Sequence, residues 1–160
     1  MNRLSMPRSR LSLAAIAVGL ITAASAVAAA GGQAPSTTTL TFQGKQNARS
    51  VHFVDQAPMG KESPGDTISF SDTLYSAGKP VGFAEVTGTL LDNKRHDADN
   101  LSGTLILADG TIVLQGTSLG KAATQHLAVV GGTGAYAGDR GEAVVTSGPK
   151  LTTFLLELSS

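Results

Sequence analysis

A glycine-rich run over residues 129–141 constrains the fold of this chain more than any other segment. A G-x-G-x-x-A spacing begins at Gly132 and fits the loose fingerprint of a dinucleotide-binding turn, which needs a helix directly after it. Gly138 and Gly141 interrupt any such helix, and the segments that follow have the composition of strands. We therefore interpret the glycines as a tight connection between strands that needs positive φ or a close approach of two backbones.

Strand-like segments recur at short intervals from Thr38 onward, and no stretch there has the period of a helix. Turn signals such as Asp109-Gly110 separate them. About eight or nine sequential strands with short turns predict an all-β fold: an antiparallel meander closed into a barrel, which leaves few exposed sheet edges. The expected strands are Thr39–Gly44, Ser50–Asp55, Asp66–Leu74, Pro80–Leu91, Leu101–Leu107, Thr111–Thr117, Gln125–Val130, Gly141–Ser147 and Leu151–Leu158.

The first thirty residues have the pattern of a signal peptide. Arg3, Arg8 and Arg10 precede an apolar stretch over residues 11–27, and small residues of a cleavage site follow. We expect a cleavable signal peptide over residues 1–30, a linker over 31–37 and one β-barrel domain over 38–160. The protein would then be secreted by the general secretory route to an extracellular location, with no membrane attachment after cleavage.

Composition excludes several classes of function. The chain contains no cysteine, which rules out disulfides and cysteine-ligated metals. The chain has 12 Lys and Arg residues and 12 Asp and Glu residues. Because the signal segment holds three of the arginines, the remaining domain is mildly acidic. This argues against nucleic acid as a partner, since nucleic-acid-binding proteins usually carry a basic excess. The histidines lack the spacing of a metal site, so we predict no metal and no other cofactor.

One acidic residue lies on an apolar face of a predicted strand. Alternation places four side chains on that face, those of Ile68, Phe70, Asp72 and Leu74. A carboxylate in an apolar cavity would have a raised pKa and could act as an acid or a base, so Asp72 is the candidate catalytic residue. Two alternatives remain: Asp72 reaches solvent at the barrel mouth, or it pairs with Arg49 or Arg140.

Four motifs follow one another along the chain: Gly65–Tyr75, Lys79–Gly82, Leu114–Gly116 and Leu127–Gly141. In this order they resemble motifs of allene oxide cyclases and their bacterial barrel relatives. The last one also resembles a motif of plant dirigent proteins. The resemblance implies an eight-stranded antiparallel barrel with an apolar cavity, often assembled as a trimer. Allene oxide cyclases steer the ring closure of a fatty-acid epoxide, and dirigent proteins steer the coupling of phenoxy radicals or quinone methides.

The resemblance also assigns positions. Asp72 falls where the cyclases carry a cavity Asn, and Ile68 falls where they carry a cavity Val. Their cavity Cys and Tyr fall near Gly88 and Ser118, so both are lost and allene oxide cyclase activity itself is not expected. Together with strand alternation and the arginine of the dirigent motif, this predicts a cavity lined by Ile68, Phe70, Ile112, Leu114, Ser118 and Arg140.

The sequence therefore predicts a secreted barrel that binds a small hydrophobic molecule and steers its cyclisation or coupling, as an isomerase or a dirigent-like protein does. Two alternatives stay open: a carrier without chemistry, and an extracellular structural or interaction protein whose barrel is packed solid. A second polar group near Asp72 would favour an enzyme over a carrier. A cavity inside the barrel would favour the enzyme and the carrier over the packed structural barrel.

Overall fold

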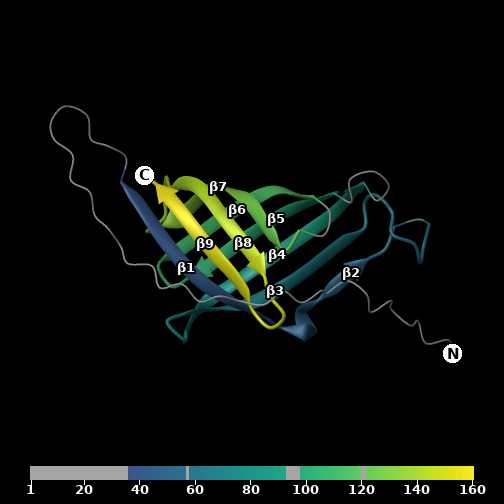
Figure 1. Cartoon of the computed structure of the whole chain (residues 1–160), viewed down its shortest axis with the longest axis horizontal. Helices are drawn as coiled ribbons and strands as arrows, with labels where there is room; N and C mark the ends of the chain where they lie inside the picture. Colours follow the sequence, from purple (N-terminus) through teal and green to yellow (C-terminus); the bar gives the residue numbers. More distant parts are fainter. Residues whose placement is uncertain (1–35, 57, 93–97, 120–121) are drawn as a thin grey trace.

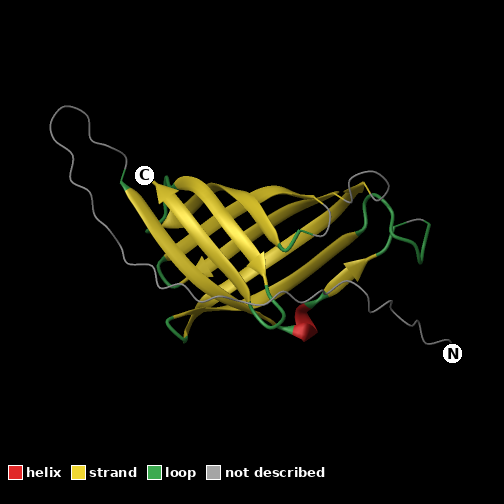
Figure 2. Cartoon of the chain, in the orientation of Figure 1, coloured by secondary structure: helices red, strands yellow, loops and turns green. Residues whose placement is uncertain are grey.

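A computed structural model of the chain describes residues 36–56, 58–92, 98–119 and 122–160 (Figure 1). These residues form β-strands and one short 3-10 helix, Ala48–Ser50, with no α-helix among them (Figure 2). No helix in this part of the chain has the length and apolar character needed to cross a membrane. The strands are β1 (Thr37–Gln46), β2 (His52–Val54), β3 (Thr67–Ser76), β4 (Lys79–Asp92), β5 (Ala98–Leu107), β6 (Gly110–Leu119), β7 (Thr124–Gly134), β8 (Arg140–Ser147) and β9 (Thr152–Ser159). Residues 1–35, on which the signal peptide and most of the linker were predicted, lie outside the described residues.

Eight of the strands close into an antiparallel barrel, as the sequence predicted (Figure 1). Strands that follow one another along the chain pair from β3 to β9, and β9 pairs with β1. β1 completes the ring by pairing with β3, from Gln43 opposite Tyr75 to Gln46 opposite Asp72. β2 lies outside this ring and pairs with the first residues of β3, beyond the point where β1 leaves it.

The glycine-rich run belongs partly to a strand rather than to a connection. The expected strand ended at Val130, but β7 continues to Gly134 and pairs with β6 along the glycines. A Cβ on Gly132 would lie 2.5 Å from the carbonyl oxygen of Tyr136 and 2.6 Å from that of Thr111. The predicted close approach of two backbones is therefore present, and it extends the strand instead of ending it.

The interior of the barrel is filled at one end only. Six interior side chains there are almost fully buried, namely those of Leu74, Ala84, Ile112, Val129, Ala143 and Leu156. Further along the same strands, toward the starts of β3 and β9, two interior positions are the glycines Gly88 and Gly103. Because neither contributes a side chain, space remains between the strands at that end.

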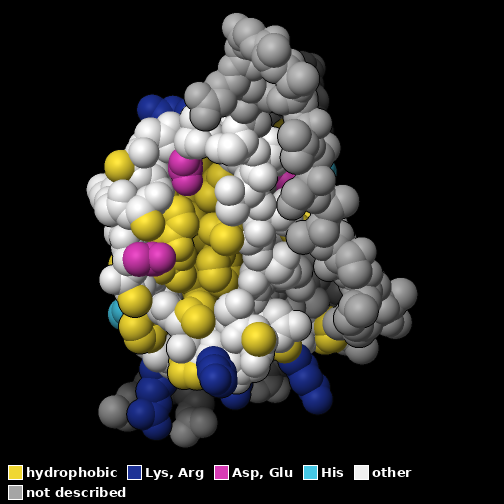
Figure 3. All heavy atoms as spheres, turned by 90° about the vertical axis from the view of Figure 1, so that its left-hand side faces the viewer, with side chains coloured by type: hydrophobic (Ala, Val, Ile, Leu, Met, Phe, Trp, Pro, Cys, Tyr) yellow, Lys and Arg dark blue, Asp and Glu magenta, His cyan; other side chains and the backbone are white. Residues whose placement is uncertain are grey.

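Apolar side chains also remain on the outside of the barrel. Phe83 and Ile106 are cross-strand partners on β4 and β5, with 52% and 41% of their surface exposed. Figure 3 shows hydrophobic side chains gathered on one face of the molecule, bordered by acidic groups. A trimer of the kind that the resemblance implies would need a surface of this kind, and the trimer stays a prediction.

Substitution of two glycines by alanine tests this account of the interior. A Cβ on Gly103 would meet its nearest neighbours at 3.7–3.9 Å, which is ordinary contact, so Gly103→Ala should stabilise the fold by about 0.5–1 kcal/mol. Gly132→Ala should destabilise it by about 2 kcal/mol or more, because backbone oxygens occupy the space. Urea unfolding of both variants measures the two changes, and a loss of stability in Gly103→Ala would contradict the hollow interior.

Candidate functional site

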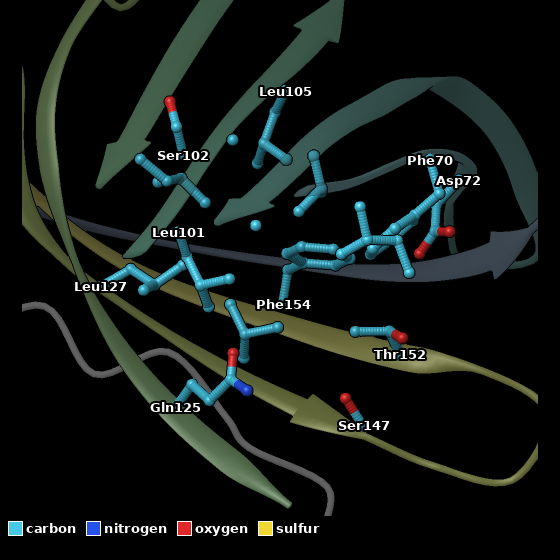
Figure 4. Close-up of a pocket in the computed structure, with 16 residues that line it drawn as sticks. Phe70, Asp72, Leu101, Ser102, Leu105, Gln125, Leu127, Ser147, Thr152 and Phe154 are labelled. Atoms are coloured by element: carbon cyan, nitrogen blue, oxygen red, sulfur yellow. The ribbon is translucent and has the colours of Figure 1, made fainter. Parts of the chain in front are cut away.

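A cavity of about 160 Å³ occupies the open end of the barrel (Figure 4). Its walls are mainly apolar, formed by Ile68, Phe70, Val86, Leu101, Leu105, Leu114, Leu127, Val145 and Phe154 with the glycines Gly88 and Gly103. The polar side chains in the wall are those of Asp72, Ser102, Gln125, Ser147 and Thr152. The interior is therefore not packed solid at this end, which argues against the packed-barrel alternative.

Asp72 is the ionisable side chain among the described residues that line this cavity. The residue is 1% exposed, and its Oδ1 has no hydrogen-bond partner. Burial raises the pKa of its carboxyl group to about 6, because the charged form loses its hydration. Asp72 therefore lies on the apolar interior face, as its strand alternation predicted. Its side chain does not reach solvent at the barrel mouth, which was one of the alternatives.

Neither arginine considered as a partner neutralises this carboxyl group. Arg49 is exposed in the 3-10 helix beyond β1. Arg140 is exposed at the start of β8, and its Nη1 donates a hydrogen bond to the carbonyl oxygen of Asp139 at 2.8 Å. The pKa of Asp72 is accordingly raised by burial alone, with no compensating positive charge.

A glycine on β1 makes room for the carboxyl group. A Cβ on Gly44 would lie 2.6 Å from Oδ2 of Asp72 and 2.8 Å from Cε2 of Phe154. The carboxyl group and the edge of the aromatic ring therefore both pack over the bare backbone of Gly44. Thr152, the cross-strand partner of Gly44 on β9, adds a hydroxyl group to the same wall of the cavity.

A second polar group enters the cavity from β7. Gln125 donates a hydrogen bond from Nε2 to Oγ of Ser118 at 3.0 Å. Ser118 is 4% exposed, so this bond fixes the amide against a buried hydroxyl group. Figure 4 shows Gln125 and Ser147 on β7 and β8, well removed in this view from Asp72 on β3.

A second hollow, of about 190 Å³, adjoins the cavity and shares Ile68 and Gly88 with it. We call it the acidic pocket, because Glu62, Asp66 and Asp99 line it. Asp66 is held there by the peptide N–H groups of Gln56 and Ser63, which donate to its carboxylate at 2.8 and 2.9 Å and lower its pKa. Asp66 therefore caps local backbone amides.

The structure brings together part of the predicted set. Asp72, Ile68, Phe70 and Leu114 all line the cavity. The other three lie elsewhere: Ile112 is in the filled end of the barrel, Ser118 lies behind Gln125, and Arg140 is on the exterior.

Sequence reasoning missed Gln125 and Thr152. Both share a strand face with buried apolar residues, Gln125 with Leu127 and Thr152 with Phe154. A polar residue on an otherwise apolar face is the same signal that identified Asp72, so alternation along β7 and β9 could have found both.

The fold and the cavity define a hollow, up-and-down eight-stranded β-barrel whose described cavity lining holds one carboxyl group, that of Asp72. The model of the allene oxide cyclase barrel like domain matches residues 38–153. The chain therefore belongs to this family. No curated protein sequence matches the chain.

Solved structures of similar fold carry several chemistries. A structure described as pyocyanin demethylase has a TM-score of 0.67 and 27% identity, over 76% of this chain and 99% of that one. The pterocarpan synthase dirigent protein GePTS1 has a TM-score of 0.63 and 20% identity, over 78% and 88%. The Diels Alderase AbmU from Streptomyces koyangensis has a TM-score of 0.60 and 19% identity, over 79% and 69%.

The buried carboxyl group makes stability depend on pH. Its pKa is about 6 in the folded chain against an ordinary 3.8, so between pH 4 and 6 the folded state binds a proton that the unfolded state has released. The Asp72 contribution to the free energy of unfolding should therefore fall by about 2–3 kcal/mol as pH rises through this window, and stay constant above it. Asp72→Asn, which does not titrate, should gain stability relative to the wild type by this amount between pH 4 and pH 8.

Chemical denaturation at the two pH values measures the difference. Glu85→Gln removes one exposed carboxylate from the outer face of β4 and is the matched control, with no such change expected. A gap between wild type and Asp72→Asn that is equal at pH 4 and pH 8 would contradict the raised pKa.

Proposed function

We propose that this barrel binds a small, mainly apolar molecule and moves a proton on it through Asp72, so that it steers an isomerisation or cyclisation. One observation carries the proposal: Asp72, whose buried Oδ1 has no hydrogen-bond partner, lines an apolar cavity. Burying such a group costs free energy unless a ligand supplies its hydrogen bond. Carboxyl groups in clefts with shifted pKa values are also common at functional sites. The neighbours described as a demethylase, a dirigent protein and a Diels Alderase support small-molecule chemistry in this fold.

The size of the cavity limits the ligand. Engineered apolar cavities of about 150 Å³ in another protein accept benzene, whereas pockets for drug-sized ligands span roughly 300–1,000 Å³. A volume of about 160 Å³ therefore suits one or two fused rings or a short aliphatic segment. The acidic pocket adds about 190 Å³ into which a larger ligand extends past Ile68 and Gly88.

The chemistry follows from a pKa near neutrality. With a pKa of about 6, the Asp72 carboxyl group holds a proton in part of the molecules and accepts one in the rest. As carboxylate it removes a proton from one atom of the ligand, and as carboxylic acid it returns that proton to another. This cycle consumes no other reactant, and the apolar walls of the cavity hold the ligand in one conformation meanwhile.

Ring opening of 5-nitrobenzisoxazole tests the proposed base directly. This bicyclic probe loses its C3 proton to a base as its N–O bond breaks, and releases a coloured cyanonitrophenolate. The barrel should accelerate the reaction about 100-fold over acetate at equal carboxylate concentration, with a rate that rises as pH increases through about 6.

Three variants test whether the acceleration comes from Asp72 in the cavity. Asp72→Asn should lose the acceleration, Glu85→Gln should keep it, and Gly103→Ala should weaken binding of the probe because its methyl group enters the cavity. Thermal shift reports binding separately. Stabilisation by the probe without acceleration would support the carrier instead, and an Asp72→Asn variant as fast as the wild type would remove Asp72 from the mechanism.

We also propose that residues 1–30 direct secretion and are removed. The proposal rests on the basic, apolar and small-residue pattern of that segment. Expression of the full chain in a bacterial host, followed by intact-mass measurement, should give an exported protein that begins near Gly31. Leu20→Arg, which interrupts the apolar stretch, should prevent export. A cytoplasmic protein that still begins at Met1 would contradict the proposal.

A further inference from the structure

The charge of the described cavity lining is one-sided. Oδ1 of Asp72 is buried and has no donor to bind, and an ionised carboxylate only accepts hydrogen bonds. The amide Nε2 of Gln125 donates one of its two N–H groups to Oγ of Ser118. The remaining polar groups in the wall are hydroxyls, which serve equally as donors and acceptors.

Positive charge is absent from the described lining. None of the described residues around the cavity is Lys, Arg or His, and the same is true of the described residues around the acidic pocket. The ionisable groups that face the two hollows are Asp72 on β3, Glu62 and Asp66 between β2 and β3, and Asp99 on β5. Within the described lining of the cavity, a ligand therefore meets the carboxyl group of Asp72 and apolar walls.

We propose that the ligand presents a hydrogen-bond donor to Asp72, with a cationic nitrogen preferred, and that the site rejects carboxylate ligands such as free fatty acids. This inference rests on the proposed function and specifies its substrate class. A donor on the ligand binds the carboxyl group of Asp72, and a positive charge also stabilises the carboxylate in a medium where its hydration is lost. A ligand carboxylate instead adds a second negative charge beside Asp72, and the described lining offers it no counter-ion.

Three probes that share one ring system separate charge from shape. They are 1-naphthylmethylammonium, 1-naphthalenemethanol and 1-naphthoate, which carry a positive, a neutral donor and a negative group on the same naphthalene. Calorimetry at pH 8 in low salt should give dissociation constants that rise in this order, by about tenfold or more at each step. Added salt should reduce the preference for the ammonium probe only slightly, because salt screens interactions in a buried cavity less than it screens surface ion pairs.

The Asp72→Asn variant assigns the preference to one residue. It should reduce the difference between the ammonium and carboxylate probes to a few-fold while the alcohol still binds. Glu85→Gln, on the outer face, should leave all three constants unchanged. Melting curves of each variant show that it is folded before binding is compared.

The outcomes distinguish the two proposals. If the alcohol binds but the three constants are equal, or 1-naphthoate binds best, the inference on substrate class is overturned while the proposed cavity function stands. If none of the probes binds, the proposed function fails as well. A preference for the ammonium that survives intact in Asp72→Asn would place its origin outside Asp72 and contradict the inference.

Discussion

Closure of the sheet by the pairing of β1 with β3 is the interaction on which the barrel, its cavity and its site depend. The seam is short, from Gln43 opposite Tyr75 to Gln46 opposite Asp72, and no disulfide reinforces it. It brings Gly44 under the carboxyl group of Asp72 and the ring edge of Phe154. A side chain at Gly44 would occupy the space that the carboxyl group takes, so closure and placement of the candidate acid–base group are set by the same residues.

Closure also gives a barrel that is filled at one end and hollow at the other. Leu74, Ile112 and Leu156 pack one end, whereas Gly88 and Gly103 leave the other end hollow. The packed end supplies the apolar burial that stabilises the fold. Above pH 6, burial of the ionised Asp72 carboxyl group lowers the free energy of unfolding. The packed end continues to stabilise the fold under these conditions.

Much of the fold could be predicted from the sequence, because turn residues and two-residue alternation mark strands directly. The position of β2 outside the ring could not, since nothing in His52–Val54 distinguishes a ninth strand from a member of the barrel. Asp72 was found by its place on an apolar face, and Gln125 carries the same signal. Arg140 was predicted to line the cavity but lies on the exterior. The motif places this residue along β8, whereas the direction of its side chain depends on strand register and on neighbouring residues.

The proposed site depends on the carboxyl group of Asp72, which lies buried in an apolar cavity with no partner for Oδ1 and titrates near neutrality. Carbon-13 NMR of the side-chain carboxyl groups, with Asp72→Asn to assign the signal, measures that titration directly. We expect a pKa of about 6 for Asp72 in the free protein. A pKa at or below the ordinary value of 3.8 would show that water or a donor reaches the carboxylate, and would contradict the account.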